Sequence, residues 1–102
     1  MPIDFNGLDS AVHGQLRLGI LTALHMDGPL DFTTLKKRLA ASDGAMGQHL
    51  LKLEEIGYLA CVKEFVGRRP RTTYRVTTAG RKALTRYLDQ MQTVIDAVRG
   101  RG

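Results

Sequence analysis

The sequence has little of what exported, membrane-bound or disulfide-stabilised proteins use. Its 102 residues include one cysteine, Cys61, so no internal disulfide can form and a reducing compartment is expected. Residues 1–7 lack the basic region and apolar core of a signal peptide, and no apolar run is long enough to cross a bilayer. We therefore expect a cytoplasmic protein with no membrane partner.

Motifs for metal binding and catalysis are also missing. His13, His25 and His49 form no His-x-x-x-His pair, and Cys61 has no Cys-x-x-Cys partner. No nucleophile–base pair, paired carboxylates or phosphate-binding glycine loop stands out. We expect no metal, no cofactor and no enzymatic activity. His49 is expected to pack or to contact a phosphate, and Cys61 to be a small core residue.

Acidic residues are scarce in one part of the chain. Between Val62 and Arg86 there are eight Lys or Arg residues and one acidic residue, Glu64, whereas the whole chain has a net charge of +5. A basic segment on a mildly acidic remainder favours a polyanionic partner. The alternative is a solvated charged surface without a partner.

The apolar pattern of the first half predicts three helices. The first is expected over residues 8–26, with a break near residues 13–14, and is apolar around most of its circumference. A very short strand at residues 30–31 precedes a second helix over residues 32–40, which Asp31 can cap. The third begins after Ser42 and ends at Gly57. Two short helices joined this closely form a helix-turn-helix over residues 32–56, an arrangement that projects its second helix into a major groove.

The two faces of the third helix differ sharply. One carries apolar residues at helical spacing and should be buried, namely Met46, Leu50, Leu53 and Ile56. The opposite face is nearly free of bulk at its start, so another large molecule could approach the backbone closely. It carries Gly44, Ala45, Gly47, Gln48, Leu51 and Lys52.

A basic hairpin is expected next, with strands over residues 59–66 and 72–77 and a turn over residues 67–71. Leu59, Cys61 and Phe65 should share one face of the first strand. Hairpin loops are often merely polar connectors. This turn carries three arginines with no nearby acid, which favours contact with phosphates.

The last helix should run from residue 78 to residue 98 after a Thr77 cap. Its apolar residues alternate three and four apart, a seam typical of dimerising helices. The alternative is that the whole seam packs on the domain's own first helix. The seam comprises Leu84, Tyr87, Leu88, Met91, Val94, Ile95 and Val98.

Together these elements predict an α+β fold, mainly α with a small β-hairpin: a winged helix-turn-helix with N- and C-terminal dimerisation helices in a single domain over residues 1–102. The sequence also resembles the small winged-helix transcriptional regulators of the MarR/ArsR-like superfamily from residue 8 to about residue 88. The segments that carry the resemblance are LDFTTL (30–35), SDG (42–44), HLLKLEEIGY (49–58), FVGRRPRTTY (65–74) and TTAGR (77–81).

The resemblance implies how the parts would act. The second helix of the motif would enter the major groove, the wing would follow the DNA backbone, and the terminal helices would form a homodimer. A small-molecule effector, where one exists, would sit between the dimerising helices and the DNA-binding core. The chain departs from the family pattern at Ala45, Gly47 and Leu51, where polar or basic residues are commonly seen. Its base-reading face is therefore poorer in hydrogen-bond donors. Either specificity depends on Gln48, Lys52 and DNA shape, or the helix is adapted to something other than strong base readout.

The sequence thus predicts a homodimeric transcriptional regulator that binds double-stranded DNA at an inverted-repeat operator. The alternative is a winged-helix protein-interaction module that does not bind DNA specifically. The expected recognition-helix contacts are Ser42, Asp43, Gly44, Ala45, Gly47, Gln48 and Lys52. The expected wing contacts are Arg68, Arg69, Arg71, Thr72 and Thr73. The expected dimer interface comprises Leu16, Ile20, Leu84, Leu88, Met91 and Ile95.

Overall fold

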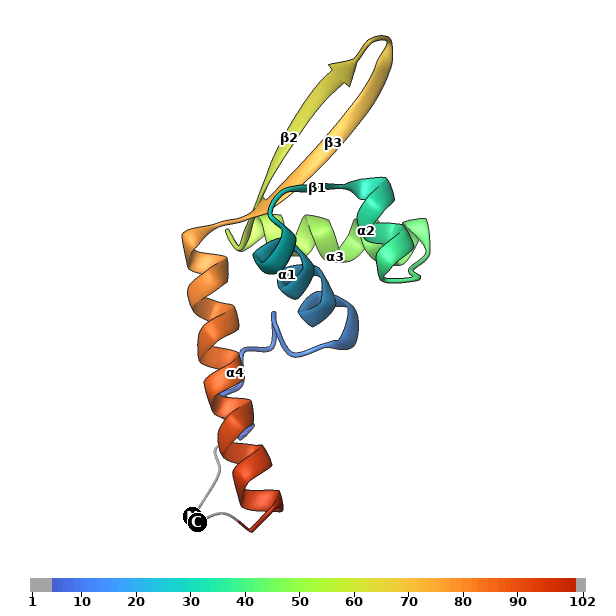
Figure 1. The fold of residues 1–102 in the computed structure, drawn as a ribbon. Coiled ribbons are helices and arrows are strands. Elements are labelled where there is room, and N and C mark those ends of the chain that lie inside the picture. The colour runs from blue at the N-terminus through green and yellow to red at the C-terminus, as the bar shows by residue number, and fades with distance from the viewer. Residues whose placement is uncertain (1–4, 101–102) are drawn as a thin grey trace.

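Three helices and a small antiparallel sheet surround one apolar core, and a fourth helix extends away from it (Figure 1). The computed structural model describes residues 5–100. The chain measures 57 × 25 × 22 Å along its principal axes, because the hairpin and the last helix project in opposite directions. The elements are η1 (Phe5–Gly7), α1 (Gln15–Asp27), β1 (Leu30–Asp31), α2 (Phe32–Arg38), α3 (Asp43–Glu55), β2 (Leu59–Val66), β3 (Arg69–Val76) and α4 (Thr78–Val98).

The sheet has the strand order β1-β3-β2, with both pairings antiparallel. β2 and β3 pair along their whole length, from Leu59 opposite Val76 to Val66 opposite Arg69. The short β1 pairs with β3 only near the base, where Asp31 lies opposite Thr73. The outer half of the hairpin is therefore a two-stranded ribbon that projects from the body as a wing (Figure 1).

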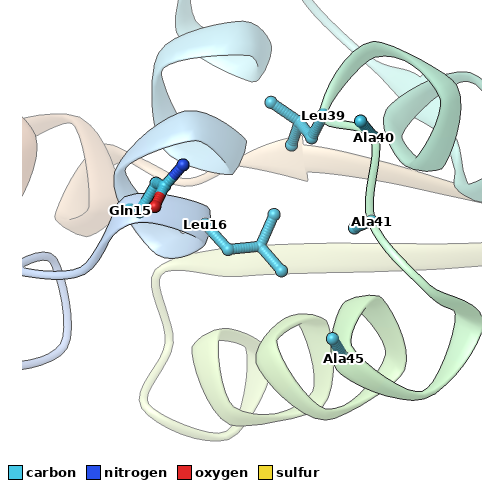
Figure 2. Close-up of a pocket in the computed structure, with 6 residues that line it drawn as sticks. All are labelled: Gln15, Leu16, Leu39, Ala40, Ala41 and Ala45. Atoms are coloured by element: carbon cyan, nitrogen blue, oxygen red, sulfur yellow. The ribbon is translucent and has the colours of Figure 1, made fainter.

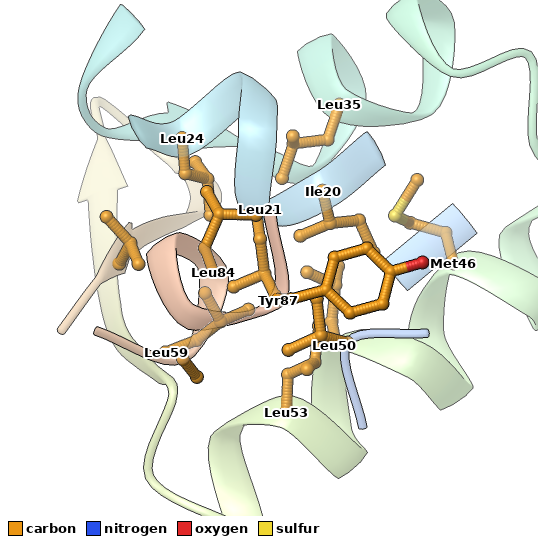
Figure 3. Packing of buried hydrophobic residues seen from close by; sticks show 13 residues of the cluster. Ile20, Leu21, Leu24, Leu35, Met46, Leu50, Leu53, Leu59, Leu84 and Tyr87 are labelled. Carbon is orange, nitrogen blue, oxygen red and sulfur yellow. The ribbon is translucent and has the colours of Figure 1, made fainter. Parts of the chain in front are cut away.

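The core lies where α1, α3 and the first half of α4 meet the base of the hairpin (Figure 3). The winged helix-turn-helix arrangement that the sequence predicts, α+β with four helices, is confirmed in this structure. The buried residues are Val12, Ile20, Leu21, Leu24, Leu35, Met46, Leu50, Leu53, Leu59, Val76, Ala83, Leu84 and Tyr87.

The first helix is shorter than the sequence suggests. It begins at Gln15 rather than at residue 8, and residues 8–14 form turns instead. The Asp9 carboxylate accepts a hydrogen bond from the Ala11 amide at 2.8 Å, a local bond that competes with helix formation. Gly14 then precedes the helix without any side-chain cap. The apolar periodicity of this segment remains meaningful, because Val12 is fully buried.

The ends of α3 follow the expected caps. The Ser42 hydroxyl accepts a hydrogen bond from the Ala45 amide at 3.2 Å. Gly57 has a φ of 86° and donates to the Glu54 carbonyl at 3.0 Å, while the Tyr58 amide donates to the Leu53 carbonyl at 2.9 Å. This pair of bonds is a Schellman motif, which uses the left-handed conformation of glycine.

Two expectations about this region are wrong. Ile56 does not continue the buried stripe: it is the C-cap residue that follows α3, and it is 40% exposed because the chain turns away from the core there. The second helix ends at Arg38 rather than at residue 40, since Ala40 turns into the left-handed region with a φ of 50°.

The hairpin turn is tighter than expected. Gly67 and Arg68 alone form it, and Arg69 already lies in β3 opposite Val66. Only the first of the two turn residues has a positive φ, 67° at Gly67, which is typical of a type II′ turn. Phe65 shares a strand face with Leu59 and Cys61 as expected, but it lies near the tip and is exposed. Cys61, at the base, is half-buried.

α4 begins directly against the end of α3. The Thr77 hydroxyl accepts a hydrogen bond from the Gly80 amide at 3.1 Å, as the sequence predicts, and donates one to the Gly57 carbonyl at 2.6 Å. A Cβ at Gly80 would lie 2.3 Å from the Tyr58 carbonyl oxygen, so only glycine fits at this crossing. The start of α4 is thereby fixed relative to α3.

Candidate nucleic-acid interface

The two helices of the helix-turn-helix share the apolar core through Leu35, Met46 and Leu50, and polar contacts add to this packing at the surface. The Asp31 carboxylate caps α2 by accepting a hydrogen bond from the Thr34 amide at 2.8 Å. Lys36 of α2 pairs with Asp43, the first residue of α3, at 2.7 Å.

The residues predicted to contact DNA on α3 lie at its start and on its outer face. Ser42, Asp43, Gly44, Gln48 and Lys52 are exposed. Ala45 and Gly47 are half-buried, at the edges of the same face. Met46, Leu50 and Leu53 are buried on the opposite side, as the periodicity predicts.

One exposed residue of this face is missing from the predicted contacts. Leu51 lies one turn beyond Gly47 and is 57% exposed. Its spacing from Gly44 and Gln48 places it on the same side of the helix. The signal was present in the sequence, since Leu51 does not fit the buried stripe of Met46, Leu50 and Leu53 and falls on the outer face instead.

The wing arginines are not equivalent. Arg68 lies in the turn and Arg69 begins β3, and among residues 5–100 neither has a carboxylate within 4.0 Å. Arg71 is different, because its Nε lies 3.6 Å from an Asp31 carboxylate oxygen, and Glu64 is the residue opposite it in the register of β2 and β3. The expectation that no acid lies near these arginines is therefore wrong for Arg71.

The Asp31 carboxylate is stabilised in its charged form. Hydrogen bonds with Thr34 lower its pKa most, and the positive charges of Arg71 and Lys37 lower it further. Its two oxygens serve two parts of the fold: Oδ1 caps α2, while Oδ2 faces the wing. Asp31 therefore joins the helix-turn-helix to the hairpin.

The two predicted wing threonines also differ. Thr72 is half-buried and lines a surface groove with Arg69 and Arg71. The Thr73 hydroxyl is buried and has no hydrogen-bond partner. Because that oxygen is shielded from solvent, Thr73 is not positioned to contact a phosphate, and the sequence-based expectation for it is wrong.

The predicted dimer residues fall into two groups. Ile20 and Leu84 are buried in the chain's own core, so they cannot also face a partner (Figure 3). Leu88 is 51% exposed, Ile95 is also exposed, and Leu16 and Met91 are half-buried. The first half of α4 thus packs on its own domain, while its second half extends beyond the body of the chain (Figure 1). Leu88, Met91 and Ile95 form an apolar stripe there that the domain does not fully cover.

The segment before α1 lies along α4. The Tyr87 hydroxyl and His13 Nδ1 are 2.8 Å apart, and the Gln90 side-chain amide donates to the Gly7 carbonyl at 2.9 Å. The Tyr58 hydroxyl donates to Asp9, and this bond raises the pKa of Tyr58.

Within residues 5–100, no three His, Cys, Asp or Glu side chains gather as a group that could hold a metal ion.

A pocket of about 290 Å³ lies between the start of α1 and the start of α3 (Figure 2). Its walls are mainly aliphatic, from Leu16, Leu39 and three alanines, with Gln15 as the polar side chain. Ala45 belongs both to this pocket and to the predicted DNA-contacting residues of α3. A molecule bound in the pocket would therefore touch α3.

None of the helices within residues 5–100 is long and apolar enough to span a membrane. Comparison with known proteins identifies one relative by sequence. An uncharacterized protein of Methanocaldococcus jannaschii is 34% identical over 73 residues, which cover 72% of this chain and 79% of that protein.

Solved structures share the fold. A transcriptional regulator homologue from Pyrococcus horikoshii has a TM-score of 0.79 and 28% identity, covering 86% of this chain and 87% of that one. MarR has a TM-score of 0.77 and 19% identity, covering 91% and 67%. A family model described as a winged helix DNA-binding domain matches residues 16–95. This chain therefore belongs to the family of winged helix DNA-binding domains, with the fold of the MarR-like transcriptional regulators.

Proposed function

We propose that this protein is a homodimeric transcriptional regulator that binds an inverted repeat in double-stranded DNA. In this proposal α3 enters the major groove and the wing follows the phosphate backbone. The proposed contacts on α3 are Ser42, Asp43, Gly44, Ala45, Gly47, Gln48 and Lys52. The proposed contacts on the wing are Arg68, Arg69 and Thr72, with a weaker one from Arg71.

The observation that carries this proposal is the combination of an exposed face on α3 with a projecting basic ribbon. α3 presents small residues and two donors, Gln48 and Lys52, to solvent. Gln48 can pair with adenine through two hydrogen bonds, and Lys52 can reach guanine or a phosphate. Arg68 and Arg69 carry positive charge that the described part of the chain does not neutralise by close ion pairs. Such charges supply the sequence-independent part of DNA affinity.

The apolar stripe on the second half of α4 supports dimerisation. Leu88 and Ile95 lie three to four residues from the half-buried Met91, and none of the three is fully covered by the domain. A second copy could cover this stripe, because an apolar surface in contact with water favours burial. Two copies related by a two-fold axis would present two α3 helices about 34–36 Å apart, which predicts half-sites about one helical turn apart.

We also propose that the protein is not an enzyme and acts in the cytoplasm. The solved relatives named above are described as a transcriptional regulator homologue and as MarR.

A small-molecule effector would occupy the pocket between α1 and α3, where its contact with Ala45 would couple its binding to the position of the recognition helix.

Selection of bound sequences from random DNA by the purified protein tests this function. Enrichment of an inverted repeat, followed by salt-dependent binding to it in fluorescence anisotropy, is the expected result. Enrichment of no sequence, with affinity that does not depend on Arg68 and Arg69, would favour the rival function, a protein-interaction module. Light scattering that finds one chain per particle, both free and on a half-site, would rule out the dimer.

A further inference from the structure

The outer face of α3 contains two glycines that the fold does not need. A Cβ added at Gly44 or at Gly47 would meet no atom within 4 Å, and neither residue has a positive φ. Gly57 and Gly80 are different, since the first has a φ of 86° and the second lies against the Tyr58 carbonyl. Glycine inside a helix costs about 0.5–1 kcal/mol relative to alanine. Folding alone therefore favours larger residues than glycine at positions 44 and 47.

Leu51 is the largest apolar side chain on this face. It is 57% exposed and lies seven residues after Gly44 and four after Gly47, so all three share one side of the helix. A single exposed leucine on a protein surface needs no explanation. Here, however, the leucine lies beside Gly44 and Gly47, which carry no side chain, on the exposed face of α3.

This juxtaposition has a matching chemistry in the major groove. Each thymine presents a C5-methyl group there, and apolar side chains contact it. Cytosine lacks this methyl group and has a hydrogen-bond donor in place of the thymine O4 acceptor, so an aliphatic contact distinguishes the two pyrimidines. The glycines would let the helix backbone approach the bases closely enough for a side chain as short as leucine to reach them.

We propose that Leu51 is a specificity-determining residue that contacts a thymine methyl group in each half-site, with Gly44 and Gly47 permitting the close approach of α3. This inference rests on the proposed function. It assigns part of the base recognition to apolar contact, on a face where Gln48 and Lys52 are the main hydrogen-bond donors.

The test removes the methyl group from the DNA. In the enriched site, each thymine is replaced in turn by uracil, which keeps the base-pairing edge and lacks only the methyl. At the contacted thymine, wild-type affinity should fall about fourfold per methyl group, because burial of a methylene-sized group contributes about 0.8 kcal/mol. Replacement in both half-sites should lower affinity roughly 15-fold if the two contacts are independent.

The Leu51→Ala variant completes the comparison. It should bind the thymine site more weakly than wild type and should lose the sensitivity to uracil. Val62→Ala is the matched control, because Val62 is a similarly exposed aliphatic residue, 50% exposed, on the wing rather than on α3. This control should keep the uracil sensitivity of the wild type.

The outcomes separate this inference from the proposed function. If wild-type protein enriches a site but no uracil replacement weakens binding, or the half-site contains no thymine, the thymine contact is overturned and the regulator remains. If Leu51→Ala stays as sensitive to uracil as wild type, the methyl is contacted by another residue and the assignment of Leu51 is wrong. If no sequence is enriched, the proposed function fails and this inference fails with it.

Discussion

Replacement of Gly47 by alanine should separate the stability of the fold from its affinity for DNA. The added Cβ would meet no atom within 4 Å, and the backbone of Gly47 does not have a positive φ. Alanine in a helix interior is favoured over glycine by about 0.5–1 kcal/mol. For a domain of this size, that gain should raise the unfolding temperature by about 2–8 °C.

The same methyl group should weaken DNA binding. If α3 lies with its backbone against the bases, the new Cβ occupies space that the duplex needs. Overpacking of a close contact costs about 1–3 kcal/mol, which corresponds to roughly 5–150-fold in affinity per half-site. Thermal unfolding and fluorescence anisotropy on the same preparation would measure both effects.

The control for this experiment is Thr93→Ala, another substitution that favours the helix. Thr93 is exposed on α4, on the side away from the apolar stripe, so its replacement should leave DNA affinity unchanged. A Gly47→Ala protein that is more stable and binds the enriched site as tightly as wild type would refute the close approach of α3. A less stable variant would instead refute the argument that position 47 has free space.

Three further predictions concern the wing, the dimer and the N-terminal cap of α2. Arg68→Ala should reduce the magnitude of the slope of log affinity for DNA against log salt concentration by about 0.9. Arg71→Ala should reduce it less, because Asp31 already lies beside Arg71. Equal reductions in the two variants would contradict this difference. Leu88→Asp should leave the fold intact, since Leu88 is exposed, but should prevent dimerisation, because an unpaired carboxylate buried at an interface costs about 3–5 kcal/mol. Analytical ultracentrifugation would detect the monomer, with Thr93→Asp as a control that should remain dimeric, and a dimeric Leu88→Asp would exclude this stripe as the interface. Asp31→Ala should destabilise the protein by about 0.5–2 kcal/mol at neutral pH through loss of the α2 cap. Because the pKa of Asp31 is lowered in the folded state, its contribution is complete above the ordinary value of 3.8 and is lost as the pH falls through the folded pKa. The free energies of unfolding of the wild type and of Asp31→Ala, measured in urea at several pH values, should therefore converge as the pH falls. A difference between them that does not change with pH would contradict the role of the carboxylate.

Local signals in the sequence predicted the parts of the fold that depend on neighbouring residues. Ser42 and Thr77 cap their helices as expected, and Gly57 ends α3 because no other residue type adopts that conformation as easily. The start of α1 differs from the prediction because of another local hydrogen bond. Apolar periodicity continues through residues 8–14, but the hydrogen bond from the Ala11 amide to Asp9 forms a turn there instead.

Contacts between distant segments could not be predicted in the same way. Asp31 reaches Arg71 because β1 pairs with β3, and no local pattern in the sequence reveals that pairing. Periodicity also says that a residue is buried without saying by what. Leu84 and Leu88 belong to one apolar seam. The domain nevertheless buries Leu84, whereas about half of the Leu88 surface is exposed.

The position of Pro70 affects how the protein behaves at high concentration. In a hairpin with a two-residue turn, the pair that flanks the turn is hydrogen-bonded, and here that pair is Val66 and Arg69. The next pair, Phe65 and Pro70, is therefore not hydrogen-bonded, and the nitrogen of Pro70 faces away from β2. β1 does not extend this far, so that side of β3 is a free strand edge in the described chain. A free edge invites pairing with other chains and aggregation, but proline offers no amide hydrogen there, and the arginines on either side repel another copy. The ribbon can therefore project into solvent without recruiting further strands, and the proposed dimer would form through the helices.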